Sequence, residues 1–348
     1  MSTFEVKVRR VEVVPHPDPE AHSIELAKVD EYFSVILKGS LRTGDLAVYI
    51  PEQAIVPEPL IEEMGLTGKL SGKDKNRVKA IKLRGQLSQG ILYRPAAWPE
   101  DWKEGVEVSE ALGIIKWIPE VPAHMSGEAA PAPSADFRAY TDIESLQRYP
   151  DMFADGQSVR IVEKLHGTNM VAGIVEGQRV VSSKGVAGRH LVLKENDNNV
   201  YWRAAKQYGL HDLLASYLDS IGQPLQTILL FGEVLGVQDL KYGLEGGKIG
   251  YCAFDLWIEG DYMSAERFDA FARLYHLPTA PILYEGPFSW AVARQYAAGQ
   301  STLAAHVREG IVVRPLPAEL RTADGERMIA KLLSPAYLVR KGETTEFE

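Results

Sequence analysis

The chain has 348 residues, of which 45% are hydrophobic and 24% are charged, and its net charge is −9 at neutral pH. This composition is typical of a soluble globular protein that is long enough for two separate cores. No apolar run approaches the length of a membrane span, and the first residues lack the apolar core of a signal peptide. The single cysteine, Cys252, excludes an internal disulfide and a cysteine-based metal cluster. We therefore expect a cytoplasmic protein that does not bind membranes.

The first part of the chain is rich in short strands. Apolar alternation and β-branched residues predict strands over 5–8, 10–13, 33–37 and 46–50. Turn sequences separate them at 15–19 and 43–45. Several short strands with regular turns are typical of a small barrel, and an OB-fold suits this size. We predict an OB-fold module that binds nucleic acid over residues 1–118.

Positive charge is concentrated between Lys69 and Arg84, although the whole chain is acidic. This segment contains seven basic residues and only one acid, Asp74. The acidic chain argues weakly against a nucleic-acid partner, whereas the local charge is what phosphate binding requires. A solvated loop is the alternative interpretation, and both stay open. If the segment binds nucleic acid, we expect the contacts to come from its central basic residues, Lys69, Lys73, Lys75, Arg77 and Lys79.

A shift in composition marks the end of the N-terminal module. Residues 119–136 are rich in Pro, Ala, Ser and Glu, which predicts a semi-rigid linker. The second domain is then predicted over 137–348. Its periodicity predicts helices over 199–219 and 265–275 and strands over 227–232, 250–258 and 310–314. This mixture lacks the regular βαβ alternation of a dinucleotide fold and indicates an α+β domain.

The most informative stretch is Glu163-Lys164-Leu165-His166-Gly167-Thr168-Asn169. Apolar runs over 159–162 and 170–175 predict a strand on each side, so Lys164 lies at the bend between them. A surface lysine beside a β-turn is the alternative, but a turn does not require His-Gly-Thr-Asn, so we interpret Lys164 as a nucleophile. We expect His166 to be a structural, hydrogen-bonded residue rather than a proton carrier.

Lys-x-His-Gly-Thr-Asn resembles the nucleotide-attachment motif of RNA ligases in the covalent nucleotidyltransferase superfamily. Five further stretches resemble the remaining motifs of that superfamily, in the same order: Ser182-Ser183-Lys184-Gly185, Leu230-Phe231-Gly232-Glu233-Val234, Tyr251-Cys252-Ala253-Phe254-Asp255-Leu256, Arg308-Glu309-Gly310-Ile311-Val312-Val313 and Met328-Ile329-Ala330-Lys331. With an OB module ahead of these motifs, the chain resembles the ATP-dependent RNA ligases of the Deinococcus and Naegleria type.

This resemblance implies an α+β fold. It consists of an N-terminal OB-fold β-barrel and a C-terminal nucleotidyltransferase domain, an ATP-grasp-like ligase adenylation domain with antiparallel sheets and flanking helices. It also implies that Lys164 takes AMP from ATP, for which the amine must be neutral although a free lysine is protonated at pH 7. Nearby cations, Lys184, Lys331 and a divalent metal, disfavour the ammonium form.

The resemblance also assigns the nucleotide and metal contacts. Phe254 stacks on adenine, the backbone around Glu163 and Leu165 reads the edge of the base, and Lys331 contacts phosphate. Asn169 orients the 5′-phosphate end or a metal-bound water, and either Lys184 or Arg189 is the other phosphate contact. Glu233 and Glu309 bind Mg²⁺ or Mn²⁺ directly or through water, since these ions prefer oxygen ligands. In the alternative that stays open, one of the two glutamates accepts a hydrogen bond from the ribose instead of binding the metal.

One departure from the family pattern is visible, and two other functions remain open. The last motif usually has two lysines separated by one residue, whereas Ile329 and Leu333 flank Lys331 at those offsets. Our main hypothesis is a monomeric RNA-repair ligase that seals a 3′-hydroxyl to a 5′-phosphate at nicks in duplexes. A GTP-dependent capping guanylyltransferase is the first alternative, but only seventeen residues follow Lys331, too few for its trailing OB domain. The second alternative is a non-catalytic RNA-binding protein with an OB-fold.

Overall fold

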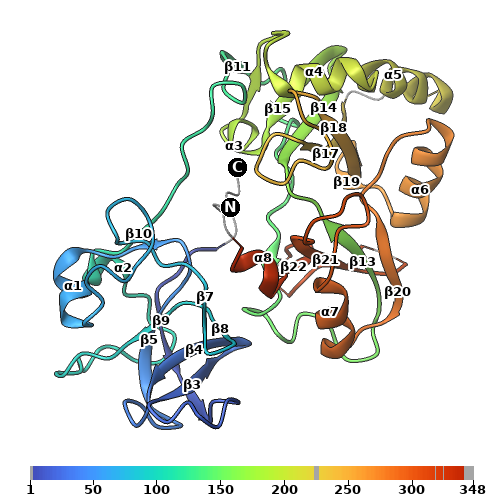
Figure 1. Ribbon diagram of the computed structural model, residues 1–348. Coiled ribbons are helices and arrows are strands. Elements are labelled where there is room, and N and C mark those ends of the chain that lie inside the picture. Colours follow the sequence, from blue (N-terminus) through green and yellow to red (C-terminus); the bar gives the residue numbers. More distant parts are fainter. Residues whose placement is uncertain (1–2, 223–226, 318, 324, 341–348) are drawn as a thin grey trace. The chain divides into compact units, whose positions relative to one another are not determined.

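The computed structural model describes residues 3–222, 227–317, 319–323 and 325–340 (Figure 1). Contacts between residues divide the chain into two units, each with its own core. The N-terminal unit takes the chain up to Ile118 together with Glu144–Pro150. The C-terminal unit takes Pro119–Ile143 and the chain from Asp151 onward. The inclusion of Glu144–Pro150 in the N-terminal unit has no signal in the composition of the sequence.

Short antiparallel strands build the N-terminal unit. One sheet has the order β1-β5-β9, from β1 (Lys7–Arg10), β5 (Leu46–Ile50) and β9 (Ile91–Tyr93). The next has the order β2-β3-β4, from β2 (Glu12–Val14), β3 (Ile24–Val29) and β4 (Tyr32–Leu37). The shorter elements are β6 (Ala54–Ile55), α1 (Glu58–Glu63), β7 (Ile81–Leu83), β8 (Gln86–Ser88), α2 (Ser109–Leu112), β10 (Ile115–Lys116) and β12 (Glu144–Ser145).

Alternation along these strands explains the core of the N-terminal unit. Val6 and Val8 are fully buried, as are Val48 and Ile50 on the neighbouring strand β5, and the four side chains belong to one hydrophobic cluster. Residues two apart in a strand point to the same face, so each strand presents an apolar face to the interior. The strands predicted over 33–37 and 46–50 are confirmed by β4 and β5.

Two antiparallel sheets form the centre of the C-terminal unit. The first has the order β22-β21-β13-β20, from β13 (Ser158–Lys164), β20 (Ile282–Pro287), β21 (Gly310–Pro315) and β22 (Ala330–Leu333). The second has the order β15-β14-β17-β18-β19, from β14 (Thr168–Val175), β15 (Gln178–Ser183), β17 (Thr227–Leu235), β18 (Gly250–Ile258) and β19 (Asp261–Tyr262). A further strand pair joins β11 (Ala129–Pro131) to β16 (Leu191–Leu193).

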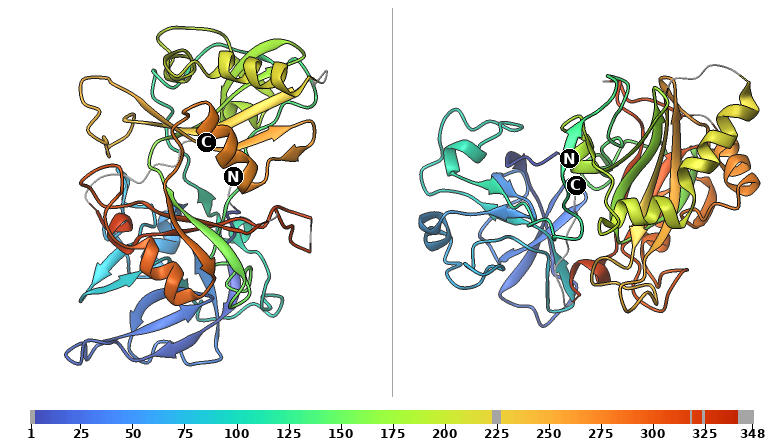
Figure 2. Two further views of the ribbon diagram at one scale, coloured as in Figure 1. Left: turned by 90° about the vertical axis from the view of Figure 1, so that its right-hand side faces the viewer. Right: turned by 90° about the horizontal axis from the view of Figure 1, so that it is seen from above.

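Helices flank these sheets. They are α3 (Lys184–Ala187), α4 (Val200–Gln207), α5 (Leu210–Ile221), α6 (Ala265–Leu274), α7 (Trp290–Ala297) and α8 (Pro335–Leu338). Figure 2 shows α4 and α5 alongside the sheet that contains β14. Tyr201, Trp202 and Leu214 from these two helices share a buried cluster with Ile228 and Leu230 of β17. Within the described ranges, no helix is both long enough and apolar enough to cross a bilayer.

The single helix predicted over 199–219 is two helices in the structure. Asn199 begins α4, because its side chain accepts hydrogen bonds from the backbone amides of Tyr201 and Trp202. Gly209 then has φ 57°, in the left-handed region, and precedes the first residue of α5. A left-handed residue ends a helix, and glycine adopts that conformation without the steric penalty of a Cβ.

Candidate active site

The two sheets of the C-terminal unit are joined at the bend between β13 and β14. Strand β13 ends at Lys164, which pairs with Gly310 of β21. Gly310 directly follows Glu309 in the sequence. Strand β14 begins at Thr168 in the other sheet, and its next residue, Asn169, pairs with Glu233 of β17. The bend therefore brings together residues from motifs that lie far apart in the sequence.

Two glycines permit the close approach of backbones at this junction. A Cβ on Gly167 would lie 2.2 Å from the carbonyl oxygen of Val234, and one on Gly310 would lie 2.2 Å from the carbonyl oxygen of Leu332. Neither position has room for a side chain, because the obstructing atoms are backbone atoms of adjacent strands. The glycines of these motifs are thus explained by packing.

Lys164 forms an ion pair with Glu309 at the junction. The distance from Lys164 Nζ to Glu309 Oε1 is 2.8 Å, and the side chains are 17% and 3% exposed. Burial by itself raises the pKa of Glu309, but the positive charge of Lys164 and the contact with His166 outweigh burial and hold it below its usual value. The other carboxylate oxygen, Oε2, is buried without a hydrogen-bond partner.

Glu233 differs from Glu309 in its ionisation. Burial raises its pKa to about 8; the negative charge of Glu309 adds to that effect and Lys164 opposes it. The pKa values of these two neighbouring acids are therefore shifted in opposite directions. Among the described residues, no group of three or more His, Cys, Asp or Glu side chains is arranged to hold a metal ion.

Two more buried acceptor atoms lie beside Lys164 in the sequence. Glu163 is 1% exposed, and its Oε2 accepts hydrogen bonds of 2.8 Å from the amide and the hydroxyl of Thr302. Its Oε1 has no hydrogen-bond partner, and neither has Oδ1 of Asn169. Buried acceptors without a partner are rare in folded proteins, and each leaves a hydrogen-bonding position open beside Lys164 or at the start of β14.

Phe254 is positioned by a β-bulge. Phe231 pairs with Asp255 and Gly232 pairs with Ala253, so Phe254 is the extra residue of β18. Its partly buried ring packs edge-on against Tyr140, with centroids 4.8 Å apart. The neighbouring Asp255 is fully buried and forms a 2.6 Å ion pair with Arg327, which makes it part of the core of the unit.

The predicted phosphate-contacting residues lie on three elements. Lys184 is the first residue of α3, and its Nζ lies 2.7 Å from Oδ1 of Asp142. Arg189 is exposed in the turn that follows α3. Lys331 is partly buried on β22, where it pairs with Val312 of β21. The roles of these residues, like those of Phe254 and the junction residues, stay predictions.

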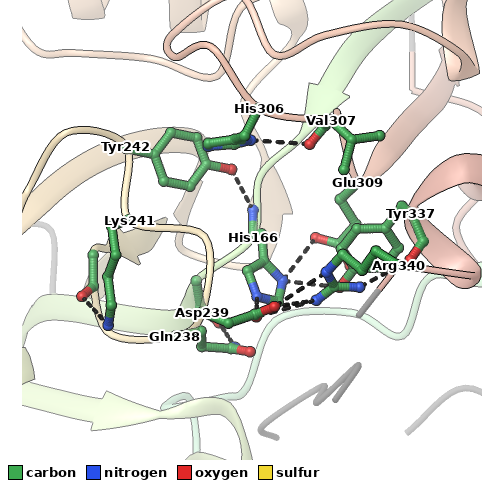
Figure 3. A network of polar contacts seen from close by, with 12 residues as sticks. His166, Gln238, Asp239, Lys241, Tyr242, His306, Val307, Glu309, Tyr337 and Arg340 are labelled. Atoms are coloured by element: carbon green, nitrogen blue, oxygen red, sulfur yellow. Dashed lines mark hydrogen bonds and ion pairs between the residues drawn. The ribbon is translucent and has the colours of Figure 1, made fainter. Parts of the chain in front are cut away.

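A polar network surrounds His166, and the sequence analysis did not predict its other members (Figure 3). The Nε2 atom of His166 lies 2.6 Å from Oδ1 of Asp239, and its Nδ1 lies 2.9 Å from the hydroxyl of Tyr337. The backbone amide of His166 donates to the Tyr242 hydroxyl, and the side chain of Gln238 donates to the carbonyl of Gly167. His166 has the hydrogen-bonded environment that the sequence analysis expected.

Few sequence signals could have found these partners. Gln238, Asp239 and Tyr242 lie in the glycine-rich loop after β17, about seventy residues from His166, and Tyr337 lies in α8. Neither segment has a periodic pattern or a motif. Only the fold brings them to the bend.

The basic segment of the N-terminal unit separates into exposed and buried side chains. Lys69, Lys73 and Lys75 are exposed, and Lys79 is partly exposed. Arg77 is only 7% exposed, and its guanidinium lies 4.1 Å from the ring centroid of Trp117. A cation stacked on an indole stabilises the unit itself.

Comparison with known proteins agrees with this arrangement. A family model described as RNA ligase matches residues 157–333, more than half of the chain, and the match includes Lys164, Glu233 and Glu309. A nucleotidyltransferase domain of the ligase type is therefore present, and the chain belongs to the RNA ligase family. A model of an OB-fold domain matches residues 5–95. A search of curated proteins found no match.

Several solved structures of Naegleria gruberi RNA ligase are similar to the chain. A lysine-to-alanine mutant with ATP and Mn is 23% identical, with 96% of this chain and 98% of that chain covered and a TM-score of 0.78. The structure with PPi is 24% identical, with 97% and 98% covered and a TM-score of 0.78. A lysine-to-methionine mutant with AMP and Mn is 22% identical, with 96% and 97% covered and a TM-score of 0.78. The predicted fold class, an N-terminal OB-fold and a C-terminal ligase domain, is confirmed.

Proposed function

We propose that this protein is an ATP-dependent RNA ligase that works through a covalent lysyl-AMP intermediate. The observation that carries the proposal is the pair of Lys164 and Glu309 at the junction of the two sheets, with Nζ and Oε1 2.8 Å apart. The Lys164 side chain is 17% exposed, so a ligand can reach it, and its ion pair with the buried Glu309 fixes the direction in which it points. The family supplies the class of reaction.

The reaction has three transfers. Once its ammonium form has given up a proton to water, the amine of Lys164 attacks the α-phosphorus of ATP, so that a phosphorus–nitrogen bond forms and the bond to the leaving pyrophosphate breaks. The AMP then passes to the 5′-phosphate of an RNA strand, which frees Lys164 and leaves a 5′–5′ pyrophosphate. Attack by a 3′-hydroxyl expels AMP and forms the phosphodiester. The ligase structures with ATP, AMP and PPi belong to a protein of the same fold.

Glu309 and Glu233 fit a divalent cation. Oε2 of Glu309, which has no hydrogen bond and lies 3.7 Å from Nδ1 of His166, and the carboxyl of Glu233 offer oxygen atoms, the donors that Mg²⁺ and Mn²⁺ prefer. Two protein carboxylates suit an ion that takes its remaining ligands from water and phosphate. Such an ion, when bound, neutralises charge on the transferring phosphate. Glu309 also accepts a hydrogen bond from Lys164, which orients the amine before it reacts.

The remaining contacts follow from where the other predicted residues lie. Phe254 offers a ring for stacking on adenine, worth roughly 1–3 kcal/mol. The backbone at Glu163 and Leu165 reads the edge of the base, and Asn169 Oδ1 orients the 5′-phosphate end or a metal-bound water. Lys331 and one of Lys184 and Arg189 neutralise the phosphates.

The N-terminal module supplies the nucleic-acid contacts in this proposal. We assign residues 1–118 to that module, 119–136 to a linker and 137–348 to the nucleotidyltransferase domain, apart from Glu144–Pro150, which belong to the N-terminal unit. The exposed lysines Lys69, Lys73 and Lys75 support binding of duplex phosphate, with the partly exposed Lys79 beside them. Arg77, which the sequence placed in the same group, is buried against Trp117 and is left out of this contact set. The substrate is then an RNA 3′-hydroxyl end at a nick, and the protein acts as a cytoplasmic monomer.

Incubation with α-labelled ATP or GTP and Mg²⁺ tests the proposal. We expect a labelled protein band with ATP, none with GTP, and none in Lys164→Arg, because arginine stays protonated at neutral pH. Label from GTP alone would favour the capping alternative, and no label from either would favour the non-catalytic one. Persistence of the label in Lys164→Arg would remove Lys164 from its role.

A further inference from the structure

A chain of polar contacts connects the C-terminal end of the described chain to the active site (Figure 3). Arg340, just after α8, holds Asp239 with two hydrogen bonds, from Nε to Oδ2 and from Nη2 to Oδ1, each of 3.1 Å. Its guanidinium also lies 3.7 Å from the ring centroid of Tyr337. A forked contact combined with stacking on a ring restricts both partners to one orientation.

The second part of the chain of contacts fixes the His166 ring. Asp239 binds one ring nitrogen at 2.6 Å and Tyr337 binds the other at 2.9 Å, and the ring is 1% exposed. With both nitrogens held and the backbone amide bound to Tyr242, the ring has no freedom to turn. The Nδ1 atom then lies 3.7 Å from Oε2 of Glu309, the acid that binds Lys164.

Polar contacts connect five side chains along this line: Arg340, Asp239, His166, Glu309 and Lys164. The pKa shifts of the two central groups are consistent with these contacts. Burial by itself raises the pKa of Asp239, but His166 and Arg340 outweigh burial and hold it well below its usual value. Burial lowers the pKa of His166, but Asp239 and Glu309 outweigh burial and raise it. Asp239 and His166 therefore each lie between two polar partners, and the line is continuous from Arg340 to Lys164.

We propose that Asp239, Tyr337 and Arg340 are positioning residues for the adenylylation of Lys164. They hold His166, and His166 holds Glu309 in the orientation that directs Lys164. Asp239 lies toward the accessible end of this line, and its side chain is 36% exposed. The inference rests on the proposed function, because it concerns the rate of the same lysine. A misplacement of about 1 Å in a catalytic group can lower a rate about a hundredfold, which makes such distant contacts measurable.

A purely structural role is the alternative, in which these contacts only attach α8 to the domain. That role would reduce thermal stability and the amount of folded protein, and it would leave the rate per folded molecule unchanged. A positioning role lowers the rate of label transfer at saturating ATP and changes the ATP concentration for half-maximal rate much less, because the three residues are not among the nucleotide contacts proposed above.

The experiment is single-turnover label transfer from ATP to the full chain over a range of ATP concentrations. The variants are Arg340→Met, Asp239→Asn, their double variant, Arg340→Lys and Tyr337→Phe, which removes one oxygen and keeps the ring. The matched control is Arg179→Met, since Arg179 pairs with Asp212 at 2.7 Å on an exposed part of the same unit. Thermal unfolding of each variant reports the folded fraction.

We expect a fall of about tenfold or more in the saturating rate for Asp239→Asn and Arg340→Met, with less than about a threefold change in half-maximal ATP concentration. Tyr337→Phe should also lower the saturating rate, and Arg340→Lys should retain part of the rate that Arg340→Met loses. The double variant should be no slower than Asp239→Asn, because Arg340 acts through Asp239. The control should match the parent.

The opposite results are equally definite. Rates equal to those of Arg179→Met, or losses that only follow the unfolded fraction, would overturn the positioning role. Additive losses in the double variant would show that Arg340 does not act through Asp239. A parent protein that takes no label overturns the proposed function and this inference with it, whereas a labelled parent with unimpaired variants overturns only this inference.

Discussion

Glu233 and Glu309 carry the same side chain, and their surroundings shift their pKa values in opposite directions. Glu309 contacts Lys164 and His166, and these cations favour its charged form. Burial raises the pKa of Glu233 to about 8, and the charge of Glu309 adds to it. Two neighbouring acids whose environments move their pKa values apart take up a proton at different pH.

This difference predicts opposite effects of amide substitution on stability. The folded-state pKa of Glu233 lies above its ordinary value of 4.5, so its contribution is present in acid and is lost as pH rises through about 8. Glu309 has a lowered pKa, so its contribution is present above the ordinary value of 4.5 and is lost only in stronger acid. At pH 8.5 in EDTA, Glu233→Gln should raise the Tm by about 2–5 °C, and at pH 7 Glu309→Gln should lower it by a similar amount.

Differential scanning fluorimetry at pH 5, 7 and 8.5 measures both shifts. The control is Glu285→Gln, because Glu285 pairs with Arg160 and is 45% exposed, away from the junction. A fall in Tm for Glu233→Gln at pH 8.5 would show that this carboxyl is ionised and paired in the folded protein.

At the scale of single elements, Gly209 determines where α4 and α5 separate. Its φ of 57° is a conformation that alanine adopts only with strain, and a Cβ at this position would have no atom within 4 Å. The cost of a substitution there is therefore conformational and not steric. Gly209→Ala should lower the free energy of unfolding by about 1 kcal/mol, and Gly209→Asn by less, because asparagine tolerates the left-handed region.

Urea unfolding of the two variants and the parent measures this difference. If Gly209→Ala stabilised the protein, α4 and α5 would have to be continuous in solution. The order of the two variants matters as much as the size of the effect, since a packing defect would make the larger asparagine worse.

The same elements show what the sequence can and cannot predict. Strands β17, β18 and β21 are predicted well, because each is a run of apolar residues bounded by glycine or charge. The prediction of one continuous helix over 199–219 is wrong at Gly209, because periodicity detects an apolar face but not a residue in the left-handed conformation. Strand β3 is not predicted, since its residues alternate only in part. At the site, motif residues such as Lys164 and Glu309 can be predicted from the short stretch of sequence around each of them.

The residues that support the site cannot be predicted from a short motif. Asp239 and Tyr337 contact His166 across large separations in sequence, and their own neighbours carry no pattern. Thr302 holds Glu163 in the same manner, from a loop after α7. Contacts of this kind are set by the packing of sheets and loops, which a single sequence does not encode in any short segment.

At the scale of the whole molecule, charge is distributed unevenly along an acidic chain. The net charge is −9, yet the segment from Lys69 to Arg84 has seven basic residues and one acid. Long-range repulsion between an acidic protein and RNA is screened within about 8–10 Å at physiological salt, so a local cluster can still bind phosphate. Exposure decides which members of the cluster are available, and it separates Lys69, Lys73 and Lys75 from Arg77.

The triple variant Lys69→Gln/Lys73→Gln/Lys75→Gln should therefore weaken binding to a nicked RNA duplex. Each lysine that contacts a phosphate contributes about 0.9 to the slope of log affinity against log salt on a duplex. We expect the slope to fall by about 2–3 and the affinity to fall about tenfold or more at low salt, with labelling of Lys164 by ATP unchanged. Fluorescence anisotropy at several salt concentrations measures both quantities.

Arg77→Gln is the matched control, because it removes one positive charge from the same segment at a buried position. Loss of its stacking on Trp117 should lower the Tm by a few degrees, since a desolvated cation–π contact is worth about 2 kcal/mol, and the salt slope should stay that of the parent. A salt slope that fell for Arg77→Gln but not for the triple variant would place the nucleic-acid contacts elsewhere. The two variants together separate a binding charge from a structural one within sixteen residues of sequence, which net charge alone cannot do.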